Sequence, residues 1–421
     1  MKILQVCKKF PFPIRDGEVI AVTSLSKSFR KLGAEVTLLA MNTSKHRVDI
    51  TTLPTSFTDI YKKIIDVPIN NDITAIGALK NLFEKESYHV TRFINNRYEK
   101  ALIRLLQSED FDIVQIETIF LTQYIPIIRQ YSKAKIVLRT HNVEHEIWKR
   151  FAEVTDFPPR RWYLNYLNKK LRRFELENLS KCDLLLAITE RDLRIFRLLG
   201  YRGKAMAIPV GLNRHDYKRQ ELSIKKNISI GFIGSLDWMP NQEGLKWFLD
   251  NVWINNNKDV ILHIAGRNAP DWLRQMKRKN VIFHGEVEDA REFMLQHPIS
   301  LVPLFSGSGI RIKILEAMML GRTVITTTMG LEGIHATDGE DVLIANTPYD
   351  FQAKLELCMT HPNLVKQIGI NARKLMESDF DNIKITERVL NEYKKITKIE
   401  SKVPHAVQNK LVEKNKKNRT Y

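Results

Sequence analysis

The sequence predicts an α/β protein built from two doubly wound domains, and three observations support this fold class. Short apolar runs typical of buried strands alternate with segments of helical periodicity along most of the chain. This alternation pauses in a polar stretch after residue 212 and then begins again. The length of 421 residues also exceeds that of one ordinary domain. We therefore expect two parallel sheets, each covered by helices, which face one another across a cleft.

The first half begins with a β-α-β unit. Residues 2–6 form an apolar run, 18–33 have a helical pattern that ends at Gly33, and 35–41 are strand-like again. Two strands joined through a helix run parallel in one sheet. Residues 42–108 are less regular, and we expect them to hold helices that decorate this sheet. Further strands of the sheet are predicted at 111–117, 134–140, 183–189 and 205–212.

The second half repeats the pattern. A buried strand at 228–236 ends in glycine and serine, and the helix predicted at 243–253 has its apolar residues at helical spacing. Four more strands are predicted at 260–266, 281–285, 299–305 and 323–327. The domain boundaries that we predict are 1–212 and 213–382, followed by a terminal helix at 383–400 that returns toward the first domain, and a basic, disordered tail at 401–421.

Composition limits the classes of partner and compartment. The formal net charge is +18, from 66 basic and 48 acidic residues, and it points to an anionic partner such as a phosphate-bearing substrate, nucleic acid or a membrane surface. Cys7, Cys182 and Cys358 lie far apart without metal-ligand spacing, which favours a reducing compartment. The amino-terminal apolar run is too short for a signal peptide, and no run reaches the roughly 18 residues of a membrane span. These features predict a cytoplasmic protein.

The segment FSGSGIRIKILEAMMLG, residues 305–321, carries the strongest chemical signal. A glycine-rich turn that leads into a helix exposes N–H groups and is a ready anion site. Arg311 and Lys313 add positive charge at the start of that helix, where the helix dipole favours anions rather than cations. Glu316 follows at a distance that suits the hydroxyls of a ligand. The segment therefore suggests a nucleoside diphosphate, although a tight turn with solvated charges explains the pattern equally well.

At this point the chain resembles a known family. The strand ISLVPLF followed by GSGIRIKILEAMMLGRTVITTTMGLEGI is similar to the donor-site signature of family 4 retaining glycosyltransferases, which have the GT-B fold of two Rossmann-like domains. DGEVIAVTSLSKSFRKLGAEVTLLA resembles the first glycine loop and helix of that family, RTHNVEHEIWKRFA its histidine segment, and GFIGSLDWMPNQEGLKWF the start of its nucleotide-binding domain. These stretches occur in the family's order, and the resemblance covers residues 1 to about 395.

The resemblance implies roles for residues on the donor side. Glu316 matches the family glutamate that binds the donor ribose, whereas a second family glutamate falls on Ser308, which alters the contact to the donor sugar. Ser235 follows Gly234 where the family often has arginine, so Arg311 and Lys313 are the expected diphosphate ligands. The remaining expected donor contacts are Gly309 in the same turn, and Gly285 and Val287 in the turn that contacts the base.

The resemblance also implies the chemistry. His141 matches the histidine that approaches the donor sugar, and Gly17 matches the glycine loop close to the phosphates. Retaining enzymes of this fold let the departing diphosphate help deprotonate the acceptor, so His141, Arg311 and Lys313 are the expected catalytic residues. No cofactor and no metal is expected. Two Asp-x-Asp triplets, at 110–112 and 379–381, are interpreted as caps or turns rather than metal sites.

Residues 148–179 interleave basic and aromatic side chains. They predict either a surface for an anionic membrane and a lipid-linked acceptor, or an amphipathic helix with a solvated face. The resemblance to enzymes of bacterial surface polysaccharide synthesis favours the first interpretation. It implies a peripheral enzyme on the inner face of the cell membrane, with a nucleotide-sugar donor and a lipid-linked or glycan acceptor.

Two alternative functions remain open from the sequence. A GT-B sugar-nucleotide 2-epimerase shares the fold but needs carboxylates around the sugar, and Ser308 in place of the expected glutamate argues against it. A basic nucleic-acid-binding protein would explain the charge of +18, yet the sequence contains no recognisable nucleic-acid module.

Overall fold

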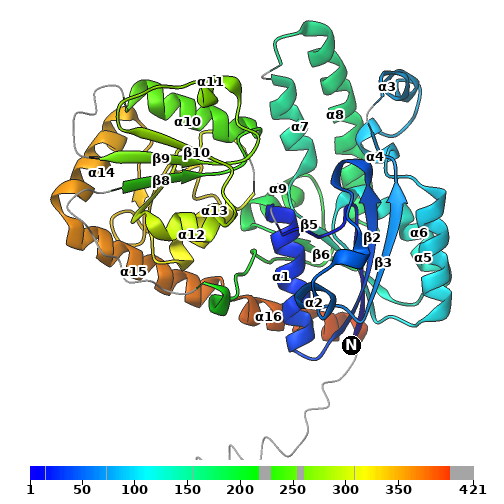
Figure 1. Cartoon of the computed structure of the whole chain (residues 1–421). Coiled ribbons are helices and arrows are strands. Elements are labelled where there is room, and N and C mark those ends of the chain that lie inside the picture. Colours follow the sequence, from blue (N-terminus) through cyan, green and yellow to red (C-terminus); the bar gives the residue numbers. More distant parts are fainter. Residues whose placement is uncertain are drawn as a thin grey trace, which may run out of the picture.

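A computed structural model describes residues 1–14, 16–72, 74–153, 155–217, 229–253, 260–307 and 309–398. The predicted tail at 401–421 and most of the polar stretch after residue 212 lie outside these described residues. The described chain forms two α/β domains that lie side by side, as Figure 1 shows. Each domain has a parallel sheet with helices packed on it, as the sequence predicts.

The first domain contains a seven-stranded parallel sheet with the strand order β3-β2-β1-β4-β5-β6-β7. The order reverses beside β1, so the carboxyl ends of β1 and β4 meet at the switch point where such sheets bind ligands. The strands are β1 (Lys2–Cys7), β2 (Glu35–Thr43), β3 (Lys63–Ile69), β4 (Ile113–Ile116), β5 (Lys135–Thr140), β6 (Leu184–Ala187) and β7 (Ala205–Ala207).

The helices of the first domain cover this sheet and extend beyond it. They are α1 (Gly17–Lys31), α2 (Thr55–Thr58), α3 (Ala75–Asn81), α4 (Tyr88–Thr91), α5 (Asn96–Ser108), α6 (Ile125–Tyr131), α7 (Glu144–Glu153), α8 (Pro158–Leu179) and α9 (Glu190–Leu198). Helices α7 and α8 pack against each other and rise above the sheet in Figure 1, with α3 beside them.

Residues 42–108 hold helices, as predicted, and they also contain β3, which the prediction did not include. This strand pairs with β2 at the edge of the sheet and is only half-buried. Pro68 and Asp66 interrupt its apolar pattern. Proline is tolerated there because one side of an edge strand has no hydrogen-bonding neighbour.

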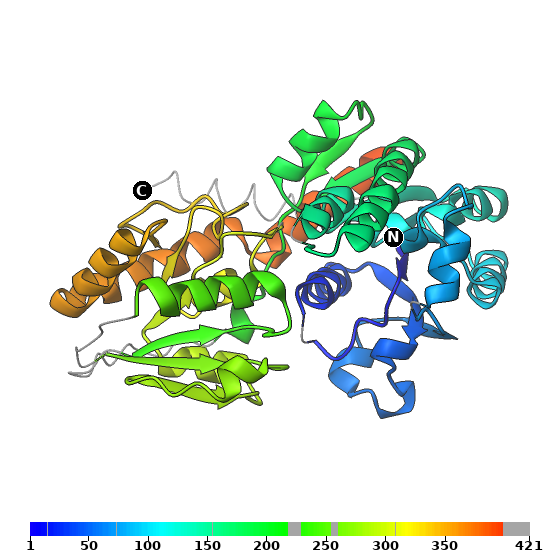
Figure 2. The ribbon, with the colours of Figure 1, turned by 90° about the horizontal axis from the view of Figure 1, so that it is seen from above.

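The second domain contains a six-stranded parallel sheet with the order β10-β9-β8-β11-β12-β13. Its strands are β8 (Ser229–Ile233), β9 (Ile261–Ala265), β10 (Val281–Gly285), β11 (Ile299–Val302), β12 (Thr323–Thr326) and β13 (Leu343–Ile344). Its helices are α10 (Met239–Asn251), α11 (Asp271–Arg274), α12 (Ala290–Gln296), α13 (Ile312–Met319), α14 (Pro348–Thr360) and α15 (Pro362–Asp379). Figure 2, seen from above, shows the two sheets in separate halves of the molecule.

The last described helix, α16 (Asn382–Thr397), leaves the second domain and packs on the first. Its buried side chains Ile385, Val389 and Tyr393 belong to the apolar cluster that also contains residues of β1, α1 and β2. Asn382 donates hydrogen bonds to the Ser24 carbonyl and the Ser28 hydroxyl of α1. The carboxylate of Asp381 caps α16 by accepting from two backbone N–H groups, as the interpretation of that triplet expects.

Candidate active site

The turn between β11 and α13 lies against the first domain. Gly307 and Gly309 have φ angles of 107° and 78°, in the left-handed region that favours glycine. A Cβ on Gly309 would lie 2.9 Å from the Asn142 side-chain oxygen and 3.4 Å from the His141 carbonyl oxygen. The small residues therefore allow a close approach of the turn to the histidine segment. Ser308 lies outside the described residues.

Arg311 occupies the N-cap position of α13, and its side chain turns back toward the glycine turn. The guanidinium donates to the Gly309 carbonyl and lies 3.8 Å from a carboxylate oxygen of Glu332. Burial lowers the pKa of Arg311, and the Glu332 carboxylate opposes this effect. The charge of Arg311 is therefore already partly balanced within the protein.

Lys313, in the first turn of α13, points toward the carboxyl end of β8. Its Nζ donates to Asn241 Oδ1 at 2.8 Å and lies 3.4 Å from the Ile233 carbonyl oxygen. Burial, assisted by the nearby Arg311 charge, lowers the pKa of Lys313 to about 7. Among the described residues no carboxylate pairs with Lys313, and a buried ammonium of this kind gains stability when an anion binds beside it.

Gly234 and Ser235 form the loop that Lys313 approaches. The Ser235 hydroxyl accepts a hydrogen bond of 2.8 Å from Arg267 Nε, and its carbonyl accepts one from Asn241. Sequence reasoning missed Arg267, although it lies two residues after the end of β9, at a strand end where ligands bind. Arg267 also helps to lower the pKa of His46, after burial, Lys9 and Lys45, so its charge acts across to the first domain.

Glu316, one turn after Lys313, lies in a different environment. Its Oε1 accepts a 2.8 Å hydrogen bond from the Tyr217 hydroxyl and lies 3.6 Å from Arg291 Nε. Burial raises the pKa of Glu316, although Tyr217 and Arg291 oppose this. Sequence reasoning named neither partner, since they come from the segment before β8 and from α12.

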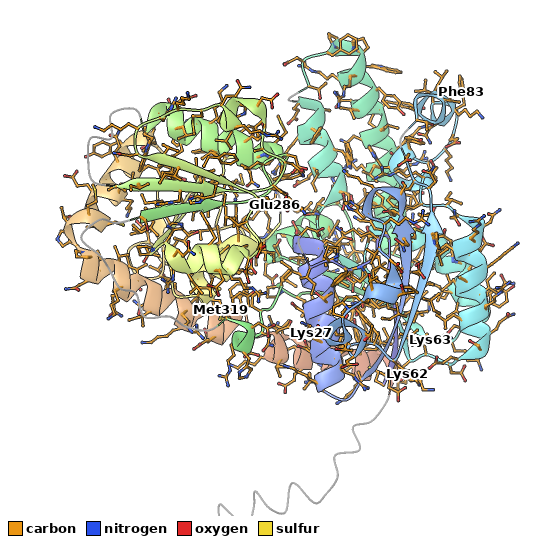
Figure 3. All side chains as sticks on the ribbon, viewed as in Figure 1. Lys27, Lys62, Lys63, Phe83, Glu286 and Met319 are labelled. Carbon is orange, nitrogen blue, oxygen red and sulfur yellow. The ribbon has the colours of Figure 1, made fainter. Side chains whose placement is uncertain are left out.

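The predicted base-contacting turn lies at the end of β10. Gly285 has a φ angle of 71°, and Val287 packs against the same apolar cluster as α13 and Tyr217. Glu286 between them is exposed, and Figure 3 shows it on the side of the second domain that faces the first. The structure therefore places this turn on the same apolar support as Glu316.

His141 follows β5 in the first domain and is held by a buried carboxylate. Its Nε2 lies 3.1 Å from Glu117 Oε2, at the end of β4. Glu117 is 1% exposed and also accepts from Gln5 and Gln115, with Arg139 at 3.4 Å. Burial acts to raise the pKa of Glu117, but Arg139 and His141 outweigh it and hold the pKa below its ordinary value.

This network continues away from the site. The Tyr393 hydroxyl of α16 donates to Gln115, whose amide donates to Glu117. Glu117 was predicted only as part of a strand, because its partners come from separate strands and a distant helix. The signal in the sequence is a glutamate at the end of a predicted buried strand, where a parallel sheet binds its ligands.

Gly17 lies opposite the start of α13. A Cβ on Gly17 would lie 3.3 Å from Ile312 Cγ1, so the glycine loop and the donor segment are in contact across the domains. Beside it, Lys9 pairs with Asp16 at 3.0 Å, and Lys8 pairs with Glu18 at 3.3 Å. The structure thus brings His141 and Gly17 to the same α13 segment that carries Arg311 and Lys313.

The basic and aromatic side chains of α8 divide into two groups. Tyr163, Tyr166 and Lys170 donate to backbone carbonyls at residues 78–84 and hold α3 against α8. Trp162, in contrast, is 62% exposed. Only part of the predicted membrane surface on 148–179 is therefore available to a partner.

The described part of the chain contains neither membrane-spanning helices nor metal-binding groups. None of its helices is long and apolar enough to cross a membrane. Within the same described residues, no group of three or more His, Cys, Asp and Glu side chains is placed to hold a metal ion.

Comparisons with known proteins agree with this arrangement. Residues 227–361 match the family model described as "Glycosyl transferases group 1". The chain is also 22% identical, over 408 residues, to a Klebsiella pneumoniae protein described as an uncharacterized 44.6 kDa protein in cps region. That alignment covers 93% of this chain and 99% of the other.

Solved structures extend the likeness to both domains. The chain is similar to HepE from Anabaena in complex with UDP-glucose, with 15% identity, a TM-score of 0.62, and coverage of 93% of this chain and 99% of that one. It is also similar to sucrose-phosphate synthase from Thermosynechococcus elongatus, with 14% identity, a TM-score of 0.70, and coverage of 95% and 100%. The fold is therefore that of GT-B glycosyltransferases, and the family match supports a glycosyltransferase.

Proposed function

We propose that the protein is a retaining glycosyltransferase. It moves a sugar from a nucleotide-sugar donor to a lipid-linked or glycan acceptor in the synthesis of cell-envelope or exopolysaccharide. The observation that carries the proposal is that Lys313 and Glu316, both on α13, lie in two different environments. Lys313 reaches the Gly234–Ser235 loop, and Glu316 lies one turn away beside Tyr217 and Arg291. A cation at a glycine loop and a carboxylate nearby suit the diphosphate and the ribose of one ligand.

The proposed reaction uses this placement. Lys313 and Arg267 stabilise the charge that develops on the departing diphosphate, because both lie at the Gly234–Ser235 loop. The departing phosphate oxygen takes the proton of the acceptor hydroxyl on the same face of the sugar, so the anomeric configuration is retained. His141, fixed by Glu117, lies against the turn that contacts the donor sugar. The protein contributes mainly orientation and electrostatic stabilisation.

The donor half of this proposal is tested by calorimetry. A panel of nucleoside diphosphates identifies the base, and the matching nucleoside is then titrated in parallel. We expect Lys313→Ala and Arg267→Ala to weaken diphosphate binding by roughly 10- to 100-fold, because both cations lie at the Gly234–Ser235 loop and a hydrogen bond to a charged group is worth about 1.5–3 kcal/mol. Neither change should affect the nucleoside, whereas Glu316→Gln should weaken both ligands. Unchanged diphosphate binding in both cation variants contradicts the assignment.

The stereochemical half is tested on the product. NMR of the isolated product should show the anomeric configuration of the donor, and turnover should persist in a chelator. An inverted product would overturn the retaining mechanism. Donor converted in the absence of any acceptor, with a changed sugar configuration, would instead identify an epimerase.

The proposal includes attachment to the inner face of the cell membrane. Exposed apolar side chains occur on and just after α3 and at the start of α8, and they include Leu79, Phe83, Phe157 and Trp162. Figure 1 shows these elements at the same end of the molecule, and Figure 3 shows Phe83 there. Each basic residue near an anionic leaflet adds about 1 kcal/mol, screened by salt. Sedimentation with liposomes should show binding that requires anionic lipid and falls with salt, and equal binding to neutral liposomes contradicts it.

A further inference from the structure

A cavity of about 500 Å³ lies between the two domains, beside the turn that precedes α13. One wall consists of α7 and the start of α8, with Ile147, Phe151 and Phe157. The other consists of Met239 and Pro240 at the start of α10, and of Ser306 and Gly307 in the loop that follows β11 (the β11 loop). The volume is within the range of about 300–1,000 Å³ that is typical of small-molecule sites.

The walls of this cavity are predominantly apolar, and polar groups at its inner end are engaged with one another. Arg150 donates to the Gly307 carbonyl, and the Ser306 hydroxyl donates to Glu243 at 3.0 Å. These pairs hold the two domains together and fix the turn between β11 and α13 (the donor turn). A ligand in the cavity therefore meets mainly side-chain hydrocarbon, which favours an apolar chain over a sugar.

The outer end of the cavity joins the exposed apolar surface. Phe157 and Arg160 line the cavity, and both are also exposed at the start of α8. Phe157 is 65% exposed, and Trp162 lies on the next turn of the same helix. Ser306 and Gly307 line the opposite end, next to Gly309 and the His141 segment. The cavity thus connects the exposed apolar surface to the donor turn.

We propose that this cavity binds the hydrocarbon chain of the acceptor, which is a membrane amphiphile with a phosphate head. The chain enters past Phe157, where Arg160 lies at the rim, and the hydroxyl-bearing part of the acceptor reaches the donor turn at 306–307. This inference rests on the proposed function and names its acceptor as a lipid rather than a free glycan.

The test uses alkyl phosphates below their micellar concentration as probes. Calorimetry with octyl, decyl and dodecyl phosphate should show an affinity that rises with chain length, by at most about fourfold per added methylene. Inorganic phosphate should not compete. Affinity that is independent of chain length would show that a phosphate site, and not the cavity, binds the probe, and would overturn the proposal.

Two cavity variants and a matched control locate the site. Met239→Asp places a carboxylate in the cavity at the first residue of α10, a position where helices tolerate acids. It should weaken dodecyl phosphate binding about tenfold or more. Phe157→Ser should also weaken it. Tyr349→Asp, at the exposed second residue of α14, should bind like the unchanged protein.

Nucleoside diphosphate binding separates this inference from the proposed function. Both cavity variants should bind the nucleoside diphosphate normally, since neither residue contacts Lys313 or Glu316 among the described contacts. If the unchanged protein binds no nucleoside diphosphate, the proposed function fails. If it binds the diphosphate but Met239→Asp binds dodecyl phosphate normally, the proposed function stands and the lipid cavity is wrong. Binding of an aryl glucoside, but of no alkyl phosphate, would also overturn it.

Discussion

At the scale of single residues, Lys313 couples donor binding to pH. Its pKa of about 7 lies well below the ordinary lysine value, so in the free protein the ammonium is present mainly below pH 7. A bound diphosphate stabilises the ammonium and raises that pKa, so binding takes up a proton above pH 7. The affinity for a nucleotide sugar should therefore fall between pH 7 and 9, by at most about tenfold per pH unit.

Calorimetry with the nucleotide sugar measures this dependence, because its phosphates do not titrate in this range. The heat should depend on the ionisation enthalpy of the buffer, which reports the proton taken up. Lys313→Met should bind more weakly at pH 7 and show no such pH dependence. A slope that survives in Lys313→Met would assign the proton to another group.

Glu117 offers a second test at this scale. Glu117→Gln keeps the shape but removes the charge that balances Arg139, which is 2% exposed. Leaving one partner of a buried ion pair alone costs about 3–5 kcal/mol. Denaturant unfolding should show this loss, and adding Arg139→Met should recover part of it. Glu387→Gln, on the exposed face of α16, is the control. A Glu117→Gln protein as stable as Glu387→Gln would contradict the network.

Much of the residue-scale site was predictable, and the limit has a physical cause. Gly309, Lys313 and Glu316 lie within one turn and one helix, so their proximity follows from local spacing. Glu117, Arg267 and Tyr217 come into contact with His141, Ser235 and Glu316, respectively, only through the packing of elements that are separate in the sequence. A single sequence carries no record of such pairings.

At the scale of elements, α10 and the β11 loop are in unusually close contact. A Cβ on Gly244 would lie 1.8 Å from the Pro303 carbonyl oxygen, so only glycine permits this approach. Gly244→Ala should displace α10 from the loop and destabilise the protein by about 1–3 kcal/mol. Because Asn241 on α10 positions Lys313, nucleoside diphosphate affinity should fall as well.

Thermal unfolding and calorimetry on the same variant check both effects. Lys246→Ala on the exposed face of α10 is the matched control and should change neither. Lower stability with unchanged diphosphate affinity would show that α10 does not transmit the displacement to Lys313. The helix predicted at 243–253 corresponds to α10, but the predicted start is four residues late. The first residues of α10, Met239 and Pro240, give no periodic apolar pattern that would indicate a helix.

At the scale of the whole molecule, the apolar core of the first domain includes α16, a helix that follows the second domain in the sequence. Ile385→Ala removes a side chain that is 3% exposed within the core of that domain, and should cost about 2–5 kcal/mol. Nucleoside diphosphate should stabilise this variant against unfolding as much as it stabilises the unchanged protein, because its affinity for the ligand remains. Arg388→Ala, exposed on the same helix, should leave stability unchanged. An Ile385→Ala protein as stable as that control would place α16 outside the core.

The two-domain architecture was predictable because both halves repeat the same alternation of strand and helix. The cavity was not, since its walls come from α7, α8, α10 and the β11 loop, and nothing local marks them as neighbours. The edge strand β3 was missed for a related reason, because its half-exposed pattern gives little periodic signal.

The return of α16 also sets an order of events during synthesis. Domains generally fold as units as the chain leaves the ribosome, with the amino-terminal one first. Here the amino-terminal domain lacks Ile385, Val389 and Tyr393 until α16 has emerged, after the second domain. The second domain, whose sheet and supporting helices end at α15, becomes complete before the first. Until then, the apolar side chains of α1 that α16 covers in the folded protein stay exposed in the nascent first domain.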